Sequence, residues 1–239
     1  MKKVNLILVC LFCLISSVYS QTEFCSKYDK ELILRKTHLV ISYNKQDKIP
    51  NYVAYELTKD MTIGDANRNK ENTFYIDENV PKSYRAYTTN YTNSGYDRGH
   101  MSPAADWKYS QDAMHESFVM SNICPQTPRL NRYDWEQVEE IERYMTHFCD
   151  TLYVINGTIC NTSKYIKNHV RVPDMFFKTL VGVYEGKVVM TEAYLFQNIT
   201  TKQLYSEHVV TIDDIEKLIG KDLYQGYWFN ELNEKENLK

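Results

Sequence analysis

The sequence lacks the excess of positive charge that is usual in proteins that bind nucleic acid through charge alone. Its 239 residues include 28 Lys and Arg against 31 Asp and Glu, a formal net charge of −3. Glycine and proline are also scarce, with 8 and 6 residues, which argues against collagen-like or linker segments. With 43% hydrophobic and 25% charged residues, the composition favours one globular domain over a disordered or coiled-coil chain.

Long apolar runs are absent after the first twenty residues. Lys2 and Lys3 precede a short apolar run at residues 6–15, and small residues lead to Ser20. This pattern describes a secretory signal peptide cleaved after Ser20, and the run is too short for a membrane anchor. We therefore expect a secreted or periplasmic protein, residues 21–239, with no membrane segment. Removal of the two lysines would lower its net charge from −3 to −5.

Cysteine is scarce beyond this leader, where four remain: Cys25, Cys124, Cys149 and Cys160. Export would permit disulfides, and four cysteines allow three pairings between which the sequence does not decide. The pairing of Cys149 with Cys160 is the least attractive, because a predicted strand at residues 152–155 would hold them apart. Free buried thiols are an equally good interpretation.

The pattern of apolar residues predicts an α+β domain with a central, mainly antiparallel sheet flanked by helices. The predicted strands are rich in β-branched and aromatic residues and lie at 38–43, 52–58, 152–156, 179–184 and 188–195. The first two are expected to form a hairpin. The predicted helices lie at 110–118, from Asn131 to Met145, and at 212–219 after Thr211 or Asp213. Residues 60–95 are polar and predict a long irregular segment.

The densest cluster of chemically versatile side chains is Asp97-Arg98-Gly99-His100. It places an acceptor, a fixed cation and a base that titrates near neutral pH within four positions. Gly99 would let the backbone turn tightly between them. By itself, such a cluster is more typical of a surface turn with a local ion pair.

A second cluster follows about thirty residues later. It comprises Ser121-Asn122-x-x-Pro125-Gln126, Leu130-Asn131, Trp135, Glu139 and Arg143. Taken alone, Asn131 would be the N-cap of the predicted helix, with Asp134 completing an imperfect capping box. Glu139 and Arg143 would form a surface ion pair worth roughly 0.3–0.5 kcal/mol.

In this order, the two clusters resemble the motifs of the DNA/RNA non-specific endonucleases of the ββα-metal (His-Me finger) group, most closely the endonuclease G type. Residues 50–57 are similar to an early strand of that family, and 169–173 with 176–178 to a later core strand. The resemblance covers about residues 38–220. It implies a ββα-metal nuclease fold and a metal-dependent endonuclease that hydrolyses DNA and RNA to 5′-phosphate ends. Because some relatives dimerise, it leaves a monomer and a homodimer both open.

The resemblance also implies a role for each matching residue. His100 would be the general base that deprotonates the attacking water, and Asn122 would help to hold it. Asn131 would be the single direct protein ligand of one Mg²⁺, with Mn²⁺ as a substitute. Glu139 would act on this metal through water.

The arginines fit the resemblance less completely. Arg98 and Arg143 would face the phosphate. Related enzymes usually have a further arginine just before an aromatic residue ahead of the first cluster, but three non-basic residues precede Phe74 here. The cations available to replace it stand at other spacings: Arg68, Lys82 and Arg85.

Phosphodiester hydrolysis needs the residue types found in these clusters. It requires a nucleophile, neutralisation of the phosphate oxygens and help for the leaving oxygen. Mg²⁺ tolerates few protein ligands because it keeps several waters. On a regular helix, Asn131 and Glu139 would be separated by about 12 Å and about 80°. A water-mediated role for Glu139 therefore fits better than direct coordination.

Two other functions are consistent with parts of the sequence. A catalytically weak or inactive nucleic-acid-binding module of the same fold would explain the missing arginine. A different metallohydrolase, such as a peptidase, would need a His-Glu-x-x-His motif or a comparable ligand set, and the sequence has none. Chance explains the Asn-x-Ser/Thr sequences better than glycosylation does, at Asn90, Asn156, Asn161 and Asn198.

The stretch that holds both clusters is the most acidic part of the chain. Residues 91–143 carry 5 basic and 9 acidic side chains. Helical geometry is expected to direct most of these acids to solvent. Phosphate binding should then rely on the metal, Arg98 and a few cations gathered by folding, and its salt dependence should be shallow. The candidate cations are Lys164, Lys167, Arg171 and Lys178.

Overall fold

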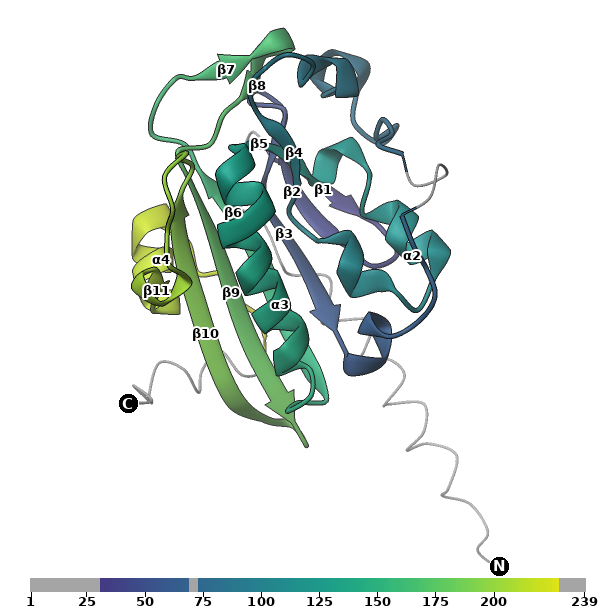
Figure 1. Ribbon diagram of the computed structural model, residues 1–239, viewed down its shortest axis with the longest axis vertical. Coiled ribbons are helices and arrows are strands. Elements are labelled where there is room, and N and C mark those ends of the chain that lie inside the picture. The colour runs from purple at the N-terminus through teal and green to yellow at the C-terminus, as the bar shows by residue number, and fades with distance from the viewer. Residues whose placement is uncertain (1–30, 69–72, 228–239) are drawn as a thin grey trace, which may run out of the picture.

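The computed structural model describes residues 31–68 and 73–227 (Figure 1). The expected signal peptide and Cys25 lie outside these residues. Within them, no helix is both long enough and apolar enough to cross a membrane. The three cysteines in this part of the chain, Cys124, Cys149 and Cys160, are free thiols.

A seven-stranded antiparallel sheet forms the centre of the fold, in the order β1-β2-β3-β6-β9-β10-β11 (Figure 1). Its strands are β1 (Glu31–Arg35), β2 (Val40–Asn44), β3 (Ile49–Leu57), β6 (Thr151–Ile159), β9 (Met175–Tyr184), β10 (Lys187–Gln197) and β11 (Val209–Val210). Two-stranded ladders join β4 (Asp97–His100) to β5 (Ile123–Gln126) and β7 (Tyr165–Ile166) to β8 (Val170–Arg171). The predicted mainly antiparallel sheet is confirmed.

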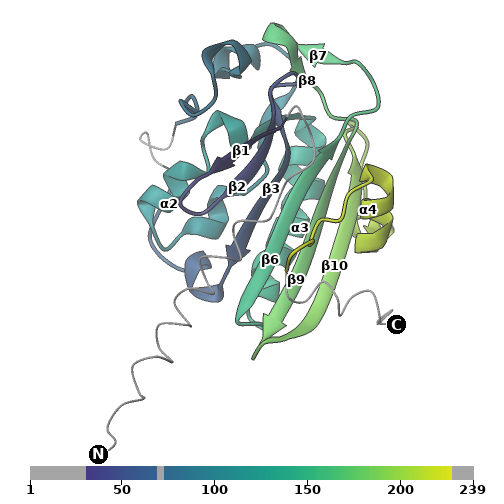
Figure 2. The ribbon, with the colours of Figure 1, turned by 180° about the vertical axis from the view of Figure 1, so that it is seen from behind.

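The two faces of the sheet are covered by different helices. Helix α3 (Trp135–Met145) packs on one face, together with α2 (Gln111–Glu116) (Figure 1). Helix α4 (Ile212–Ile219) covers the other face (Figure 2). Because side chains alternate along a strand, β9 sends Phe176 and Leu180 into the α3 core and Phe177 and Val181 into the α4 core. Lys178 has the same parity as Phe176, so it enters the α3 core.

The ββα unit stands on the α3 side of the sheet. Strands β4 and β5 pair in antiparallel register, with Asp97 opposite Gln126 and His100 opposite Ile123. The chain then passes through a π-helical turn (Leu130–Asp134) directly into α3. This unit brings the first predicted cluster beside the beginning of the predicted helix.

Several predicted elements are confirmed, with changed bounds. The predicted hairpin is β2–β3, the three later strands are β6, β9 and β10, and the short helices are α2 and α4. Thr211 caps α4, because its hydroxyl accepts a hydrogen bond from the Asp214 amide. The described residues of the 60–95 segment, 60–68 and 73–95, are largely irregular, as expected, with short 3₁₀ turns at Lys59–Thr62, Lys82–Tyr84 and Thr88–Asn90. The remaining 3₁₀ turns are Ala104–Trp107, Met120–Asn122, Lys167–His169 and Tyr205–Glu207.

Candidate active site

A polar cavity of about 250 Å³ opens between β4 and the start of α3. It brings together four of the predicted site residues, Arg98, His100, Asn131 and Glu139. Arg68, which was predicted only as an alternative cation, also lines the cavity. The remaining lining residues were not predicted as part of the site: Phe74, Pro103, Arg132 and Glu136. Residues more than 70 positions apart in the sequence therefore share one cavity.

The first cluster is an extended strand, so its interpretation as a surface turn is wrong. Gly99 is buried in β4, opposite Cys124. A Cβ atom at this position would lie 2.0 Å from Oε1 of the Gln126 side chain. The glycine is therefore needed for close packing of β4 on β5, and not for the expected tight turn.

His100 stands at the end of β4 in an aromatic enclosure. Its ring centroid lies 5.3 Å from that of Phe74 and 4.9 Å from that of Phe118, and the residue is only 8% exposed. Burial, with a smaller contribution from the Arg68 charge, lowers the pKa of His100 to about 3. Its Nε2 has no hydrogen-bond partner among the described residues. The ring is thus a neutral imidazole with an uncommitted nitrogen, as a general base requires.

Two arginines flank this histidine. The Arg98 guanidinium lies over the rings of Phe74 and Tyr91, at 5.4 and 5.9 Å, and donates a hydrogen bond to the Thr88 carbonyl. Its Nε lacks a partner among the described residues. Arg68 lies over the Phe118 ring, at 5.6 Å. Arg68 therefore brings a cation to the cavity although its spacing from Phe74 is unlike that of the family.

The other two candidates for the missing arginine do not line the cavity. Arg85 uses its guanidinium within its own loop, where it donates hydrogen bonds to the carbonyls of Val80 and Glu78. Lys82 lies in an exposed 3₁₀ turn. Of the three cations that the sequence offered, Arg68 is the one that the fold places in the cavity.

Asn131 lies in the π-helical turn and does not cap α3, so its interpretation as an N-cap is wrong. Its Nδ2 donates to Asp97 Oδ2 at 3.1 Å. Arg132 grips the same carboxylate with two hydrogen bonds, of 2.7 and 2.8 Å, and holds the pKa of Asp97 below its usual range. Because the amide nitrogen is engaged, the Oδ1 of Asn131 is the atom left to meet a ligand.

Glu139 lies two turns further along, on the cavity side of α3. Burial in the cavity wall raises the pKa of Glu139 to about 7, although Lys178 and Arg143 act in the opposite direction. Its carboxylate has no hydrogen bond within the described part of the chain. The π-helical turn changes the regular spacing from which the 12 Å separation was calculated, and such turns are frequent at functional sites.

Asn122 lies outside the cavity and supports it from behind. It is fully buried, accepts a hydrogen bond from the Ser102 amide at 2.9 Å and donates to the carbonyls of Ser102 and Ser117. It therefore holds the backbone two residues after His100, and not the imidazole itself.

Arg143 also lies outside the cavity lining. Its Nη1 donates to Asp106 Oδ1 at 3.1 Å, so the expected surface ion pair with Glu139 is wrong. Nothing in the structure places this guanidinium against a phosphate in the cavity. Asp106 is fully buried, and burial raises its pKa well above the usual range.

A buried polar network that the sequence did not predict lies between α3 and the sheet. Lys178 forms an ion pair with Glu142, and both are fully buried. The Tyr55 hydroxyl donates to Glu142 Oε1 at 2.5 Å and lies 3.1 Å from Asp106 Oδ2. Asn156 Nδ2 donates to the Met101 carbonyl at 2.5 Å and to the Tyr55 hydroxyl. The network thus ends on the residue that follows His100.

This network overturns two expectations. Lys178 is not a cation for the substrate, because it is buried against Glu142. Most of the five acids at 134–142 were expected to point to solvent, but only Glu136 and Glu140 are exposed. Glu139 lines the cavity, Glu142 is buried, and Asp134, at the end of the π-helical turn, is paired with Arg129. Asn156 is also buried, so it is no glycosylation acceptor in the folded chain.

The other candidate cations are partly engaged. Arg171 pairs with Asp47 and donates to the carbonyls of Cys160 and Thr162. Lys167 is exposed and donates to the Thr92 carbonyl. Lys164 is exposed and lies over the Tyr96 ring, at 5.2 Å. The shallow salt dependence remains a prediction.

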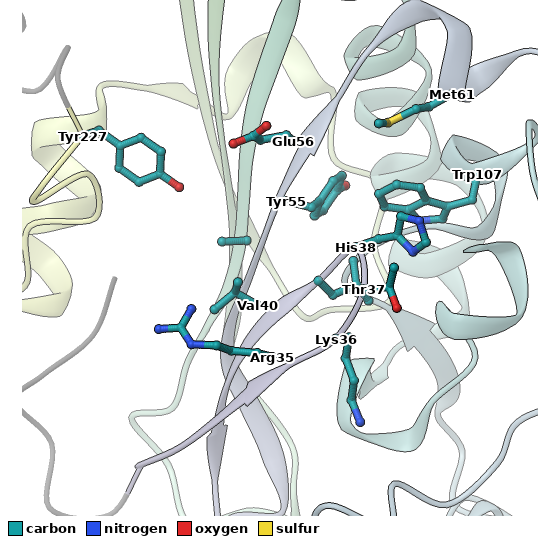
Figure 3. A pocket seen from close by; sticks show the side chains of 12 residues that line it. Arg35, Lys36, Thr37, His38, Val40, Tyr55, Glu56, Met61, Trp107 and Tyr227 are labelled. Atoms are coloured by element: carbon teal, nitrogen blue, oxygen red, sulfur yellow. The ribbon is translucent and has the colours of Figure 1, made fainter. Parts of the chain in front are cut away.

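A different hollow, of about 160 Å³, lies beside β1–β3 (Figure 3). Tyr55, Trp107 and His38 lie close together in its wall, and the Tyr55 and Trp107 ring centroids are 5.6 Å apart. It contains none of the predicted site residues. At one corner of this hollow, His38 Nε2 lies 2.7 Å from the Tyr109 hydroxyl, so this imidazole nitrogen already has a hydrogen-bond partner.

Comparison with known proteins identifies the family to which the chain is similar. The family described as DNA/RNA non-specific endonuclease matches residues 20–230. Bovine mitochondrial endonuclease G is 32% identical over 195 residues, which is 76% of this chain and 65% of that protein. Nuclease C1 of Cunninghamella echinulata var. echinulata is 31% identical over 202 residues, covering 78% of this chain and 80% of that protein.

The fold has a close counterpart among solved structures. A crystal structure of the EndoG/EndoGI complex matches with a TM-score of 0.73 and 28% identity, covering 81% of this chain and 86% of that chain. The predicted ββα-metal nuclease fold is therefore confirmed. The chain spans just under two thirds of the bovine relative.

The comparisons overturn the expected secretion. Several matched animal and yeast relatives, including the bovine protein, are named as mitochondrial. A secreted or periplasmic location is therefore wrong on this evidence. The physical reason is that basic residues near the N-terminus occur in secretory and mitochondrial targeting segments alike, so they do not define the compartment.

Proposed function

The chain belongs to the DNA/RNA non-specific endonuclease family, and from that premise we propose that it hydrolyses phosphodiester bonds of both DNA and RNA with the help of one Mg²⁺. The observation that carries this proposal is the single cavity shared by His100, Asn131, Glu139 and three arginines. We assign the activity to one domain within residues 21–239.

The residues present fit a cation that keeps most of its waters. Asn131 offers an amide oxygen, since its nitrogen is tied to Asp97, and Glu139 offers a carboxylate with no partner among the described residues. No group of three His, Cys, Asp or Glu that could hold a metal occurs in the described part of the chain. A site with few oxygen ligands and open space for water suits Mg²⁺, or Mn²⁺ as its substitute. It does not suit structural zinc, which prefers nitrogen and sulfur ligands.

In the proposed mechanism, Asn131 would hold the cation directly and Glu139 would contact it through water. The bound cation would neutralise charge on the phosphate and on the leaving oxygen. His100 accepts a proton from the attacking water, whose oxygen adds to phosphorus while the bond to the 3′ oxygen breaks. The leaving 3′ oxygen takes a proton from solvent water, and His100 later releases its proton to solvent, so that the products are a 5′-phosphate and a 3′-hydroxyl. The neutral state of His100 supports this role, because a protonated imidazole cannot accept a proton.

The arginines divide into two groups in this proposal. Arg98 and Arg68 face the phosphate, because both line the cavity and their guanidinium groups stack on aromatic rings beside His100. Arg143 holds α3 against the 104–107 turn through Asp106. Asn122 positions the segment after His100. The position of Arg68 weakens the alternative of an inactive binding module, whose only support was the missing arginine.

Cleavage assays on plasmid DNA and on RNA test the proposal. We expect cleavage with Mg²⁺ or Mn²⁺ and none with EDTA. The variant His100→Ala should lose about 10²- to 10⁴-fold in rate, whereas His147→Ala, at an exposed position after α3, should keep the wild-type rate. Cleavage by His100→Ala at the wild-type rate, or cleavage that resists EDTA, would contradict the mechanism.

A further inference from the structure

A second hollow, of about 380 Å³ and lined by both polar and apolar groups, lies beyond the start of β4 and plays no part in the mechanism above. Its wall comes from the segment between β6 and β7, from residues 172–175 at and before the start of β9, and from the end of β10 with the two residues that follow. The residues that matter for its chemistry are Tyr96, Asn161, Lys164, Gln197 and Ile199. Its size is in the range of pockets that bind small organic ligands.

This hollow is a neighbour of the catalytic cavity. Tyr96 directly precedes Asp97, whose carboxylate holds Asn131 and Arg132 at the cavity. Along extended chain, Tyr96 and His100 are separated by about 13 Å. On the other side, the Thr127 amide donates to Asn198 Oδ1 at 2.8 Å, which fixes the end of β10 to the loop before Asn131. A flexible strand of a few nucleotides can therefore reach from the catalytic cavity to this hollow.

The hollow offers three kinds of contact that suit a nucleotide. Tyr96 supplies an aromatic ring, and the Lys164 ammonium lies 5.2 Å from the centroid of that ring. The side-chain amides of Asn161 and Gln197 make no hydrogen bond among the described residues, and both residues are exposed. Ile199 adds an apolar surface that is 37% exposed. Aromatic rings stack on bases, amides pair with base edges, and a lysine binds phosphate.

The one carboxylate in this wall is already occupied. Asp174 accepts hydrogen bonds from the amides of Asn161 and Thr162 and from the Thr162 hydroxyl. These bonds hold the pKa of Asp174 below its usual range despite partial burial. The Asp174 carboxylate is thus compensated by the 161–162 loop, and the other charged side chain of the wall is the exposed Lys164, which lies over the Tyr96 ring.

We infer that this hollow binds one unstacked nucleotide of the substrate strand, and that the enzyme therefore prefers single-stranded nucleic acid. The inference rests on the proposed function, because it places the nucleotide on the same strand as the phosphate that is cut. In a duplex, a base is stacked and paired, so neither its face nor its edge can meet Tyr96 and Gln197 together. Extruding it has an energetic cost.

Binding in EDTA, without cleavage, tests the inference. Fluorescence anisotropy would compare a labelled single-stranded oligonucleotide with a hairpin duplex of the same sequence. The wild-type protein should bind the single strand more tightly. Tyr96→Leu should raise the Kd for the single strand roughly 5- to 100-fold, since stacking on one aromatic ring is lost, with a much smaller change for the duplex.

Matched controls separate the hollow from general effects. Tyr184→Leu removes an exposed tyrosine at the far end of β9 and should leave both Kd values unchanged. Gln197→Ala and Lys164→Gln change exposed side chains and keep the test decisive if Tyr96→Leu fails to fold. Lys187→Gln, at the start of β10, is the control for lost charge.

Two results would overturn the inference: wild-type protein that binds the duplex as tightly as the single strand, or hollow variants that bind the single strand like the wild type. Failure of the proposed function would look different. In that case, the wild-type protein would cut neither the single strand nor the duplex with Mg²⁺, whatever the Kd values in EDTA.

Discussion

Two carboxylates on the same helix, Glu139 and Glu142, stand three residues apart and have opposite surroundings. Glu139 lines the open cavity with His100 and has no hydrogen bond in the described part of the chain. Glu142 is fully buried on the sheet side, where Lys178 and Tyr55 both bind it. A rotation of about 300° over three residues of an α-helix leaves the two side chains only about 60° apart. Their surroundings differ because Glu139 lies at the edge of the cavity, whereas Glu142, one turn further along, lies against the sheet.

We call the buried polar network between α3 and the sheet the support; it comprises Tyr55, Asp106, Glu142, Asn156 and Lys178. The contrast between Glu139 and Glu142 shows how a residue of the candidate active site differs from a residue of the support. Glu142 has its counter-charge inside the fold, so its bonding capacity is used up by structure. Glu139 has burial but no bound partner, which leaves its oxygens for a ligand. A raised pKa alone does not make this distinction. Glu216, on α4 at the opposite face, also has its pKa raised to about 7 by burial, yet it accepts a hydrogen bond from the Leu223 amide.

The largest expected effect comes from breaking the support. Lys178→Met leaves the Glu142 charge buried without its partner, and should lower the free energy of unfolding by about 3–5 kcal/mol. The double variant Lys178→Met with Glu142→Leu removes both charges and should recover much of this loss. Urea denaturation measures both. A double variant no more stable than Lys178→Met would show that the pair is not the source of the loss.

A smaller effect is expected where the support meets the site. Asn156→Leu removes the donor to the Met101 carbonyl and should cost about 1–3 kcal/mol. It should also lower kcat, because Met101 follows His100. Thr179→Val removes a buried hydrogen bond to the Tyr224 hydroxyl on the α4 side and should reduce stability without lowering kcat. Equal losses of kcat in the two variants would contradict the coupling of Asn156 to the site.

The smallest effect concerns Glu216. Because its folded pKa is raised above that of an unfolded glutamate, its contribution to stability is complete below about pH 4.5. It is then lost as pH rises toward 7. Glu216→Gln should flatten the decline in unfolding free energy across this window, whereas Glu140→Gln, exposed on α3, should not. An unchanged slope in Glu216→Gln would show that this carboxyl does not titrate as its burial indicates.

The sequence predicted those parts of the molecule that depend on local patterns. Apolar spacing located β6, β9, β10 and α4, and ordered motifs located His100, Asn131 and Glu139, which the fold gathers into one cavity. These residues carry the family resemblance, so their proximity could be expected from order alone.

The rest depends on pairings that no local pattern reveals. Lys178 was predicted as one of several candidate cations for the substrate, but strand parity turns it toward Glu142. Arg68 was one of three candidate cations whose spacing differs from that of the family, and only the folded structure shows that it lines the cavity with His100. The π-helical turn at Asn131 has no sequence signature comparable to a cap.

The most direct test of this division measures two quantities on two variants. Glu139→Gln should lower the Mg²⁺-dependent cleavage rate about 10- to 100-fold and leave the free energy of unfolding unchanged or higher. Glu142→Gln should lower the free energy of unfolding by about 3–5 kcal/mol, while the folded protein still cleaves. If both variants lose activity and stability alike, or if the two effects are exchanged, the assignment of Glu139 to the site and Glu142 to the support is wrong.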